Sequence, residues 1–356
     1  MEEAFAKNKQ LNAQEIQQRK TRLDSFMMKL IVTLSSRCNL RCIMCEVCRT
    51  DWEIPPKALE QITEVFPYLE NISWQGGEPF LLEYFGSFFS RAASFKNIKQ
   101  TIVTNGLLIS EAWAEKLVNN NVELTFSIDG LTRQVYEHIR RGAAFDNVIR
   151  SVKLVNRMRK NNPSSRITTR LHVVIMKSNY HQLGEFVDFA KEYEFQALHL
   201  MPVQGEVAGI ENVFSPPDKN VIRHISAMKK TIEEKAKKYN LLLLNALPED
   251  TAHKDEQIPL SPEGQDGQPL CQMPWQQLNI DPGGGVRPGC LCLKTVGSIL
   301  ENRIMDMWNN DAMQSYRKGI IEQDFKPICN PNCISLQRSE RLRNQKFINT
   351  QLIQAK

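Results

Sequence analysis

The chain has 356 residues, with 45 Lys and Arg against 40 Asp and Glu, and 42% of it is hydrophobic. These proportions are those of a folded globular protein and exclude a disordered or collagen-like chain. The net charge of +5 and the pI near 8.6 are too mild to indicate a nucleic-acid-binding protein. No apolar run approaches the about 20 residues of a membrane span, and the N-terminus lacks a signal-peptide core. We therefore expect a cytoplasmic protein with no membrane partner.

The nine cysteines fall into two groups near opposite ends of the chain. A reducing compartment makes a disulfide framework unexpected, and soft thiolate ligands favour zinc or iron–sulfur clusters. The pattern therefore predicts two metal centres. The first group is Cys38, Cys42, Cys45 and Cys48, and the second is Cys271, Cys290, Cys292, Cys329 and Cys333.

In chain order, residues 1–28 read as a polar helical extension, and residues 29–240 alternate between strand-like and helix-like patterns. Six such units imply a parallel sheet with right-handed crossovers, which is two units short of a full barrel. We expect an α/β fold, a partial (β/α)6 TIM-like barrel with its ligands at the carboxyl ends of the strands. The predicted strands are residues 29–34, 71–74, 100–103, 123–128, 168–176 and 197–202.

The rest of the chain divides into three predicted segments. Residues 241–270 are rich in Pro, Gly, Asp and Glu and read as a linker. Residues 271–335 contain the second cysteine group and are expected to form a small auxiliary domain. Residues 336–356 form a basic, polar tail.

The first cysteine group lies directly after the first predicted strand and reads Cys38-x3-Cys42-x2-Cys45, with Cys48 following. Zinc ribbons instead use two distant C-x2-C pairs. One alternative is four-cysteine binding of one cluster. The other is three-cysteine binding, which leaves one iron open to a substrate or cofactor and makes Cys48 a bystander thiol.

Polar, glycine-rich tips follow the next three predicted strands. Paired glycines allow a ligand to approach the backbone closely, and Glu78 is an acceptor suited to an ammonium group. Each tip alone is an ordinary turn, but together they place polar groups on one rim of the barrel. The tips are Gly76-Gly77-Glu78-Pro79, Thr104-Asn105-Gly106 and Ser127-Ile128-Asp129-Gly130.

With these motifs in this order, the chain resembles the radical S-adenosylmethionine (radical SAM) superfamily over residues 29–205. Ile139-Arg140, followed by Gly142 and Phe145, extends the match. The resemblance implies a [4Fe–4S] cluster whose fourth iron binds the amino and carboxylate groups of SAM. The reduced cluster, supplied by a flavodoxin- or ferredoxin-type donor, would split SAM into methionine and a 5′-deoxyadenosyl radical that takes a hydrogen atom from substrate.

The same resemblance assigns roles to particular residues. Glu78 would receive the SAM ammonium, Arg140 would pair with the SAM carboxylate, and Ser127 or Asp129 would meet the ribose or the substrate. Met44 and Met201 would flank the adenine, where Met44 replaces the aromatic residue common in the family. The implied cluster ligands are Cys38, Cys42 and Cys45, and the remaining cofactor-binding residues are Gly76, Gly77, Pro79 and Asn105.

The second cysteine group could hold zinc, but in this context an auxiliary [4Fe–4S] cluster is favoured. Its spacing is similar to the auxiliary-cluster (twitch or SPASM) domains of the superfamily, and more to the shorter twitch form. The expected ligands are Cys271, Cys290, Cys329 and Cys333. Cys292 remains and has three readings: a ligand in place of a neighbour, a catalytic hydrogen-atom donor as in peptide epimerases, or a small buried hydrophobe.

Two substrate classes follow for such an enzyme. The twitch-like spacing favours oxidation of a carbohydrate or cyclitol, with the auxiliary cluster accepting an electron. The alternative is a peptide-modifying maturase or epimerase with Cys292 as donor, and the short N-terminal extension weighs against leader-dependent peptide binding. A non-enzymatic electron-transfer protein explains the cysteines but not the strand-end motifs. His172 and His199 are interpreted as packed core residues.

Overall fold

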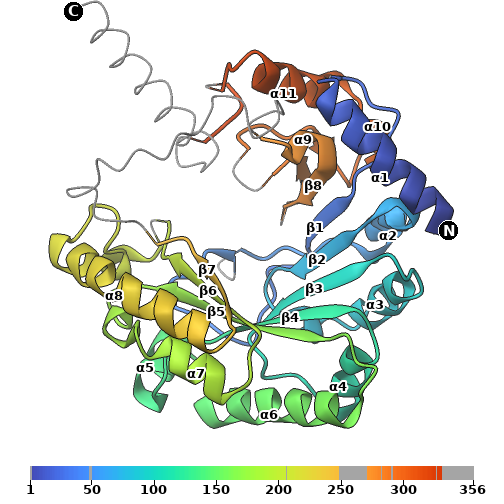
Figure 1. Cartoon of the computed structure of the whole chain (residues 1–356). Coiled ribbons are helices and arrows are strands. Elements are labelled where there is room, and N and C mark those ends of the chain that lie inside the picture. The colour runs from blue at the N-terminus through green and yellow to red at the C-terminus, as the bar shows by residue number, and fades with distance from the viewer. Residues whose placement is uncertain are drawn as a thin grey trace, which may run out of the picture.

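The computed structural model describes residues 2–47, 50–205, 207–247, 271–281, 283–289, 292–325 and 327–330. Within these residues ten strands form one curved sheet in the order β10-β9-β8-β1-β2-β3-β4-β5-β6-β7 (Figure 1). The strands are β1 (Lys29–Thr33), β2 (Asn71–Gln75), β3 (Lys99–Thr104), β4 (Val122–Ser127), β5 (Thr168–Ile175), β6 (Ala197–Pro202), β7 (Leu242–Asn245), β8 (Gln277–Ile280), β9 (Gly285–Arg287) and β10 (Gly297–Ser298).

The expected partial barrel is confirmed, but its parallel sheet is wider than six strands. β7 follows β6 in parallel register, within the segment expected to be a linker. On the other side β8, expected in a separate domain, pairs in parallel with β1. In the described sheet, the only antiparallel pairs are β8 with β9 and β9 with β10. The auxiliary segment therefore continues the barrel sheet rather than standing apart from it.

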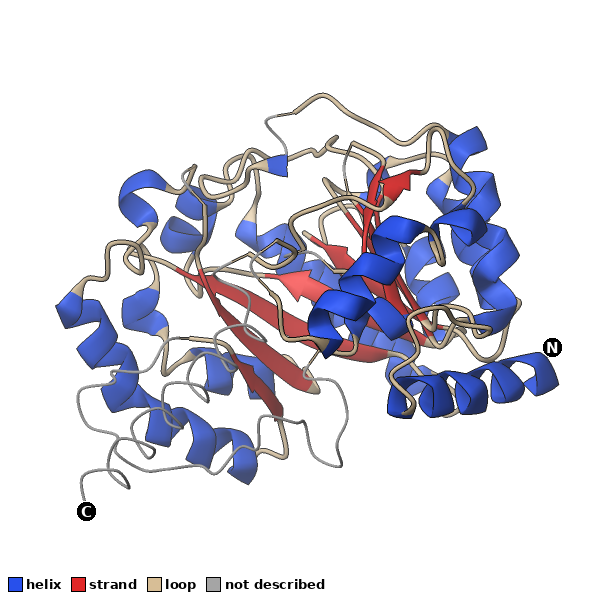
Figure 2. Cartoon of the chain, turned by 90° about the horizontal axis from the view of Figure 1, so that it is seen from above, coloured by secondary structure: helices blue, strands red, loops and turns tan. Residues whose placement is uncertain are grey.

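Helices cover the outer face of the sheet and leave the inner face to other groups (Figure 2). Along β5 every second side chain is buried, as expected for a strand with one face against helices. The described helices are α1 (Glu2–Gln17), α2 (Pro56–Leu59), η2 (Glu60–Tyr68), η3 (Pro79–Leu81), α3 (Phe85–Ala93), α4 (Glu111–Val118), α5 (Arg133–Ile139), α6 (Phe145–Asn161), η4 (Tyr180–Gln182), α7 (Phe186–Glu192), η5 (Gly209–Glu211), α8 (Lys219–Lys238), α9 (Met273–Gln276), α10 (Ile304–Met307) and α11 (Asp311–Ile321).

An aromatic group fixes α3 and α4 to the outer face of β2. Trp74, Phe85 and Phe89 are buried, and Phe85 stacks on Trp113 with ring centroids 5.5 Å apart. Burial of each such side chain contributes about 1.5–3 kcal/mol. This packing holds the carboxyl end of β2, where the Gly76-Gly77 tip begins, in a fixed position.

The N-terminal extension packs on the auxiliary segment (Figure 1). Asn12 in α1 donates to the carbonyl oxygen of Trp275 at 2.6 Å, and the Trp275 indole donates to the carbonyl of Lys20 at 2.8 Å. The Trp308 indole donates to the carbonyl of Ser25 at 2.7 Å. The first and last parts of the described chain therefore form one structural unit.

Arg317 in α11 is the centre of this unit. It is completely buried, and its guanidinium donates to the carbonyl oxygens of Thr21, Pro274 and Trp308. Buried charged groups are tolerated only with such hydrogen bonds. A single side chain therefore links the N-terminal extension, α9 and the end of α10.

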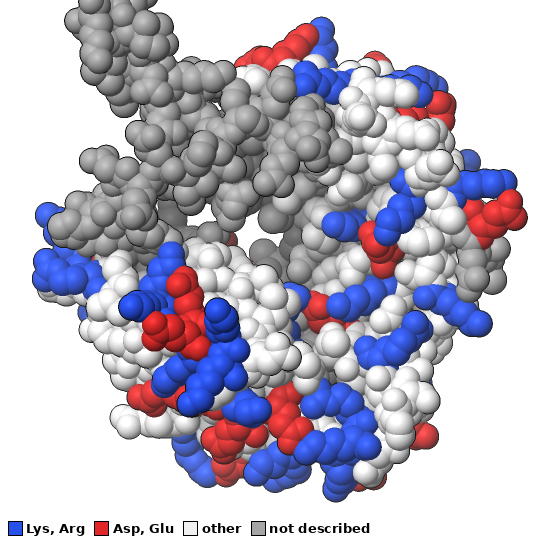
Figure 3. Space-filling model, in the orientation of Figure 1, with Lys and Arg blue, Asp and Glu red and all other residues white. Residues whose placement is uncertain are grey.

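The described surface is charged and mixed in sign. In the view of Figure 3, Lys and Arg side chains are interspersed with Asp and Glu rather than gathered in one patch. Among the described helices, none combines the length and apolarity needed to cross a bilayer.

Candidate active site

The loop after β1 brings three of the predicted ligand cysteines together. Burial raises the pKa of the Cys38 thiol and raises that of Cys42 to about 11, and the neighbouring thiols add to both effects. Over the described part of the chain, no three His, Cys, Asp or Glu side chains are arranged to hold a single metal ion. A [4Fe–4S] cluster needs a wider arrangement, because each cysteine binds a different iron. Cys38, Cys42 and Cys45 lie close enough to affect one another's pKa, as such an arrangement requires.

The end of α5 holds this loop through its backbone. The Arg41 amide donates to the carbonyl of Arg141 at 2.9 Å, and the Ile43 amide donates to the carbonyl of Ile139 at 3.0 Å. These two bonds flank Cys42 on either side. The backbone of the cysteine loop is therefore hydrogen-bonded to the Arg140 region, which lies almost 100 residues later in the sequence.

Arg140 lies between Cys42 and Asp129. Its Nη2 is 2.6 Å from Asp129 Oδ2 in a buried ion pair, and its Nη1 is 3.9 Å from Cys42 Sγ. Asp129 also accepts a hydrogen bond from the Val174 amide at 2.7 Å. The structure therefore brings three predicted site residues together, with the Arg140 guanidinium engaged by the protein rather than left for SAM alone.

Glu78 ties two strand ends together. Its Oε1 accepts from Thr104 Oγ1 at 2.8 Å, and its Oε2 accepts from the Asn105 amide at 2.8 Å. Burial raises the pKa of this carboxyl to about 7, although those hydrogen bonds oppose the rise. Both carboxylate oxygens of Glu78 therefore accept hydrogen bonds from the protein itself. The sequence predicted only a bond to the SAM ammonium and not these internal bonds.

Gly76 and Gly77 are required by the chain's own backbone. A Cβ at Gly77 would lie 1.9 Å from the Arg37 carbonyl oxygen, and one at Gly76 would lie 2.5 Å from that of Ser35. The Gly77 amide donates to the Ser35 carbonyl at 2.6 Å. The sequence predicted close approach of a ligand here. The observed close approach is by the segment that leads into Cys38.

Asn105 reaches the first cysteine of the loop. Its Nδ2 donates to Asn39 Oδ1 at 2.8 Å and lies 3.8 Å from Cys38 Sγ, and the Leu40 amide lies 3.4 Å from the same sulfur. Hydrogen bonds to cysteine sulfur orient a cluster ligand and affect the cluster's reduction potential. Asn105 therefore fits a position next to the cluster.

Met44 belongs to a small apolar group that is separate from the main core. Ile139, Met176, Val203 and Ala208 form its buried centre, and Met44 packs against it together with Ile43 and Val174. This group connects the cysteine loop to the ends of β5 and β6. Pro79 is buried at the start of η3, Ser127 is buried at the end of β4, and Met201 is half-buried on β6.

Two features of the site received no assigned role from the sequence, although Tyr136 was considered as a residue that could reach substrate. The Tyr136 hydroxyl is buried near Arg140, Asp129 and Cys42 and has no hydrogen-bond partner among the described residues. His172 and His199 lie on the inner face of the sheet rather than in the core between sheet and helices. No motif marks these residues, and only strand alternation could have indicated the face of the two histidines.

At the auxiliary site, Cys271, Cys292 and Cys329 lie within the described residues, whereas Cys290 and Cys333 lie outside them, as does Cys48 of the first group. Cys292 and Cys329 face each other in an antiparallel bridge. Burial raises the pKa of the Tyr316 hydroxyl to about 12, with both thiols contributing, so this hydroxyl lies near the two sulfurs. Cys292, which the sequence left over after the four expected ligands, therefore lies beside Cys329, one of those ligands.

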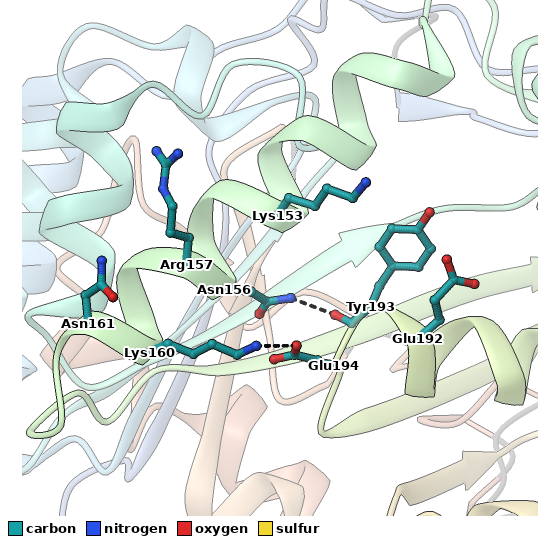
Figure 4. A pocket seen from close by; sticks show the side chains of 8 residues that line it. All are labelled: Lys153, Asn156, Arg157, Lys160, Asn161, Glu192, Tyr193 and Glu194. Atoms are coloured by element: carbon teal, nitrogen blue, oxygen red, sulfur yellow. Dashed lines mark hydrogen bonds and ion pairs between the residues drawn. The ribbon is translucent and has the colours of Figure 1, made fainter.

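A pocket on the opposite side of the barrel is unrelated to this site (Figure 4). It lies between the last turns of α6 and the end of α7, at the edge where β5 begins. The Asn156 side chain donates to the Tyr193 carbonyl, and Lys160 pairs with Glu194 across it. The cysteine loop lies at the other edge, where the parallel strands end.

Comparison with known proteins identifies the class. Residues 32–190 match the radical SAM superfamily, and residues 271–334 match SPASM, an iron–sulfur cluster-binding domain. The chain therefore contains a radical SAM domain followed by a C-terminal SPASM domain. These two domains imply SAM and [4Fe–4S] clusters as cofactors.

Curated relatives match about half of the chain. The cysteine-type anaerobic sulfatase-maturating enzyme of Clostridium novyi is 26% identical over 195 residues, which are 49% of this chain and 50% of that protein. The GTP 3′,8-cyclase of Synechocystis sp. is 26% identical over 188 residues, 50% of this chain and 55% of that protein. The chain thus spans about half the length of the curated relatives it matches.

Solved structures show the same fold at low identity. Streptococcus suis SuiB bound to precursor peptide SuiA has a TM-score of 0.65 and 21% identity, covering 87% of this chain and 70% of that one. Native anSMEcpe with bound AdoMet and Cp18Cys peptide has a TM-score of 0.61 and 19% identity, covering 88% and 91%.

Proposed function

We propose that this protein is a peptide-modifying radical SAM maturase. The observation that carries the proposal is the combined radical SAM and SPASM architecture, shared in fold with SuiB and anSMEcpe, both of which are seen with bound peptides. The sulfatase-maturating relative supports the same substrate class. The expectation of a carbohydrate or cyclitol substrate has no support among these relatives, whereas the peptide alternative does.

The residues of the first site would act as follows. Cys38, Cys42 and Cys45 would hold the catalytic cluster, and Arg140 and Asn105 would donate to its sulfur ligands. When bound and reduced, the cluster and SAM supply a 5′-deoxyadenosyl radical that takes a hydrogen atom from substrate. The polar strand tips would orient SAM, with Glu78 and Arg140 closest to its charged groups, and the apolar group around Met44 would cover the adenine and exclude water.

The second site would hold one auxiliary [4Fe–4S] cluster through Cys271, Cys290, Cys329 and Cys333, which gives two clusters per chain. It would take an electron from the substrate radical in a net oxidation. A flavodoxin- or ferredoxin-type protein would supply the electron for the first cluster.

Peptide epimerisation is a second candidate, because the bridge between Cys292 and Cys329 places a further thiol beside the auxiliary site. A Cys292→Ala variant separates the two roles of this residue. Loss of about four irons per chain would make Cys292 a ligand. Full iron content with loss of solvent-deuterium incorporation into product would make it the hydrogen donor.

The main test uses the full chain reconstituted anaerobically with iron and sulfide. We expect about eight irons per chain and reductive cleavage of SAM, and loss of cleavage in Cys38→Ala. Candidate peptides encoded near the gene are then offered beside sugars and cyclitols. Modification of a sugar with no response to any peptide would overturn the proposed substrate class.

A further inference from the structure

The inner face of the sheet carries a row of polar side chains just below the cysteine loop. His172 on β5 stands in register with Ser127 on β4 and with His199 on β6. The two imidazole rings are 5.0 Å apart and tilted by 33°. The row therefore begins next to Ser127, a residue of the candidate active site, and continues across the neighbouring strands.

A second row lies one register step further from the loop. Thr125 on β4 pairs with Arg170 on β5. The Glu123 carboxylate binds both the Lys99 ammonium, at 2.7 Å, and the Arg170 guanidinium. Glu123 offsets part of the positive charge of Lys99 and Arg170. The inner face therefore offers hydrogen-bond donors without a strong net charge of either sign.

Several buried atoms of these rows have no hydrogen-bond partner in the described part of the chain. They lie on adjacent strands and on the same face, and buried polar atoms normally find a partner in the protein, in water or in a ligand. Such atoms are therefore where a polar ligand gains most by binding. They are His172 Nε2, Arg170 Nε, Thr125 Oγ1 and Thr168 Oγ1.

We propose that His172, with Arg170 and Thr125, binds the main chain of the peptide substrate on the inner face of the sheet, beside Ser127. The assignment rests on the proposed peptide function and adds the residues that recognise the peptide. Arg170 Nε can only donate, a hydroxyl and a neutral imidazole can also donate, and consecutive peptide carbonyls are the matching acceptors.

The environment of His172 suits this role. Burial, followed by the effects of His199, Arg140 and Arg170, lowers the pKa of its imidazole to about 3, so the ring stays neutral near pH 7. The half-buried Val174 and Met201 share the inner face and offer apolar contacts. Because His172 is neutral and the charge of Arg170 is offset by Glu123, this face carries donors with little net charge, which fit an uncharged backbone better than a phosphate or a carboxylate.

The experiment measures binding of defined peptides to the SAM-loaded, cluster-containing protein by equilibrium dialysis. The probes are acetylated, amidated heptapeptides that carry each common amino acid in turn at the centre of a Gly-Ala-Ser background. We expect His172→Phe to raise the Kd of the bound peptides about tenfold, the effect of one lost buried hydrogen bond. His172→Gln, which keeps a donor, should return the Kd to within about threefold.

His181→Asn, a change of an exposed histidine, is the matched control and should bind like the wild type. Wild-type affinity in His172→Phe would overturn the inference while leaving the peptide function intact. Equal losses in His172→Phe and His172→Gln, with matching drops in thermal midpoint, would show a packing role and also overturn it. A wild-type protein that cleaves SAM but binds none of the peptides would overturn the proposed function itself.

Discussion

The Nη1 atom of Arg140 lies 3.9 Å from the sulfur of Cys42, while its Nη2 atom is 2.6 Å from Asp129. One guanidinium thus connects the second cysteine of the loop to the end of β4. A positive charge and an N–H donor beside a ligand sulfur stabilise the reduced, more negative state of a cluster. Arg140 is therefore positioned to influence the cluster as well as SAM.

Arg140→Gln should lower the midpoint potential of the site-differentiated cluster, because the positive charge beside Cys42 is lost. Breaking the buried pair should also destabilise the protein by about 3–5 kcal/mol, because Asp129 is left buried and unpaired. A redox titration followed by electron paramagnetic resonance measures the first effect, and chemical unfolding measures the second. The Arg140→Gln, Asp129→Asn double variant should recover stability and part of the potential, because it removes one charge of each sign near Cys42. An unchanged potential in Arg140→Gln would contradict the effect of this charge on the cluster.

Stability should depend on pH through Glu78. Its pKa rises from the ordinary 4.5 to about 7 on folding, so the folded state binds the proton more tightly than the unfolded state. The contribution to stability is therefore full below about pH 4.5 and is lost as pH rises through about 7, at about 1.4 kcal/mol per pKa unit of difference. Urea unfolding of the metal-free protein between about pH 5 and 8 measures the slope. Glu78→Gln should flatten it, and an unchanged slope would contradict this origin.

Gly77→Ala should prevent cluster assembly, because its Cβ would collide with the Arg37 backbone at 1.9 Å. Relief of the clash requires the segment leading into Cys38 to move. Iron content after reconstitution and the thermal midpoint are the measurements. Gly86→Ala in α3 is the matched control, since its Cβ would make ordinary contact with Trp113 at 3.7 Å. That control should be neutral or stabilise by up to about 1 kcal/mol.

Arg317→Met should destabilise the protein by about 3 kcal/mol or more, because three carbonyl oxygens lose a charged donor. The loss should loosen the N-terminal extension as well as α11, which hydrogen exchange at residues 20–28 would detect. Lys318→Met changes the neighbouring, exposed cation and should shift stability by less than about 0.5 kcal/mol. Unchanged exchange in Arg317→Met would contradict the link between the two ends.

The sequence predicted the barrel and the location of the first site, because both depend on local signals. Strand-like runs alternate with helical ones, and each motif directly follows its strand. The pairing of β8 with β1 could not be predicted, because no local pattern specifies a neighbour almost 250 residues away. The same is true of Asn12 and Trp275, whose contact explains the N-terminal extension.

Side-chain roles were harder to predict than positions. Gly77 was correctly singled out, but what approaches it is Arg37 of the same chain. His172 was assigned to the core, because β5 is rich in apolar residues and conceals which alternate positions face inward. In both cases the deciding contact joins segments that are distant in sequence.

The pairing of β8 with β1 has a consequence for biosynthesis. β1 carries the catalytic cysteine loop at its end, yet one of its two neighbouring strands is among the last parts of the barrel to leave the ribosome. Until β8 docks, the edge of β1 presents unpaired amide and carbonyl groups. A chain truncated before residue 271 would therefore keep its cysteine motif but expose an open sheet edge beside it.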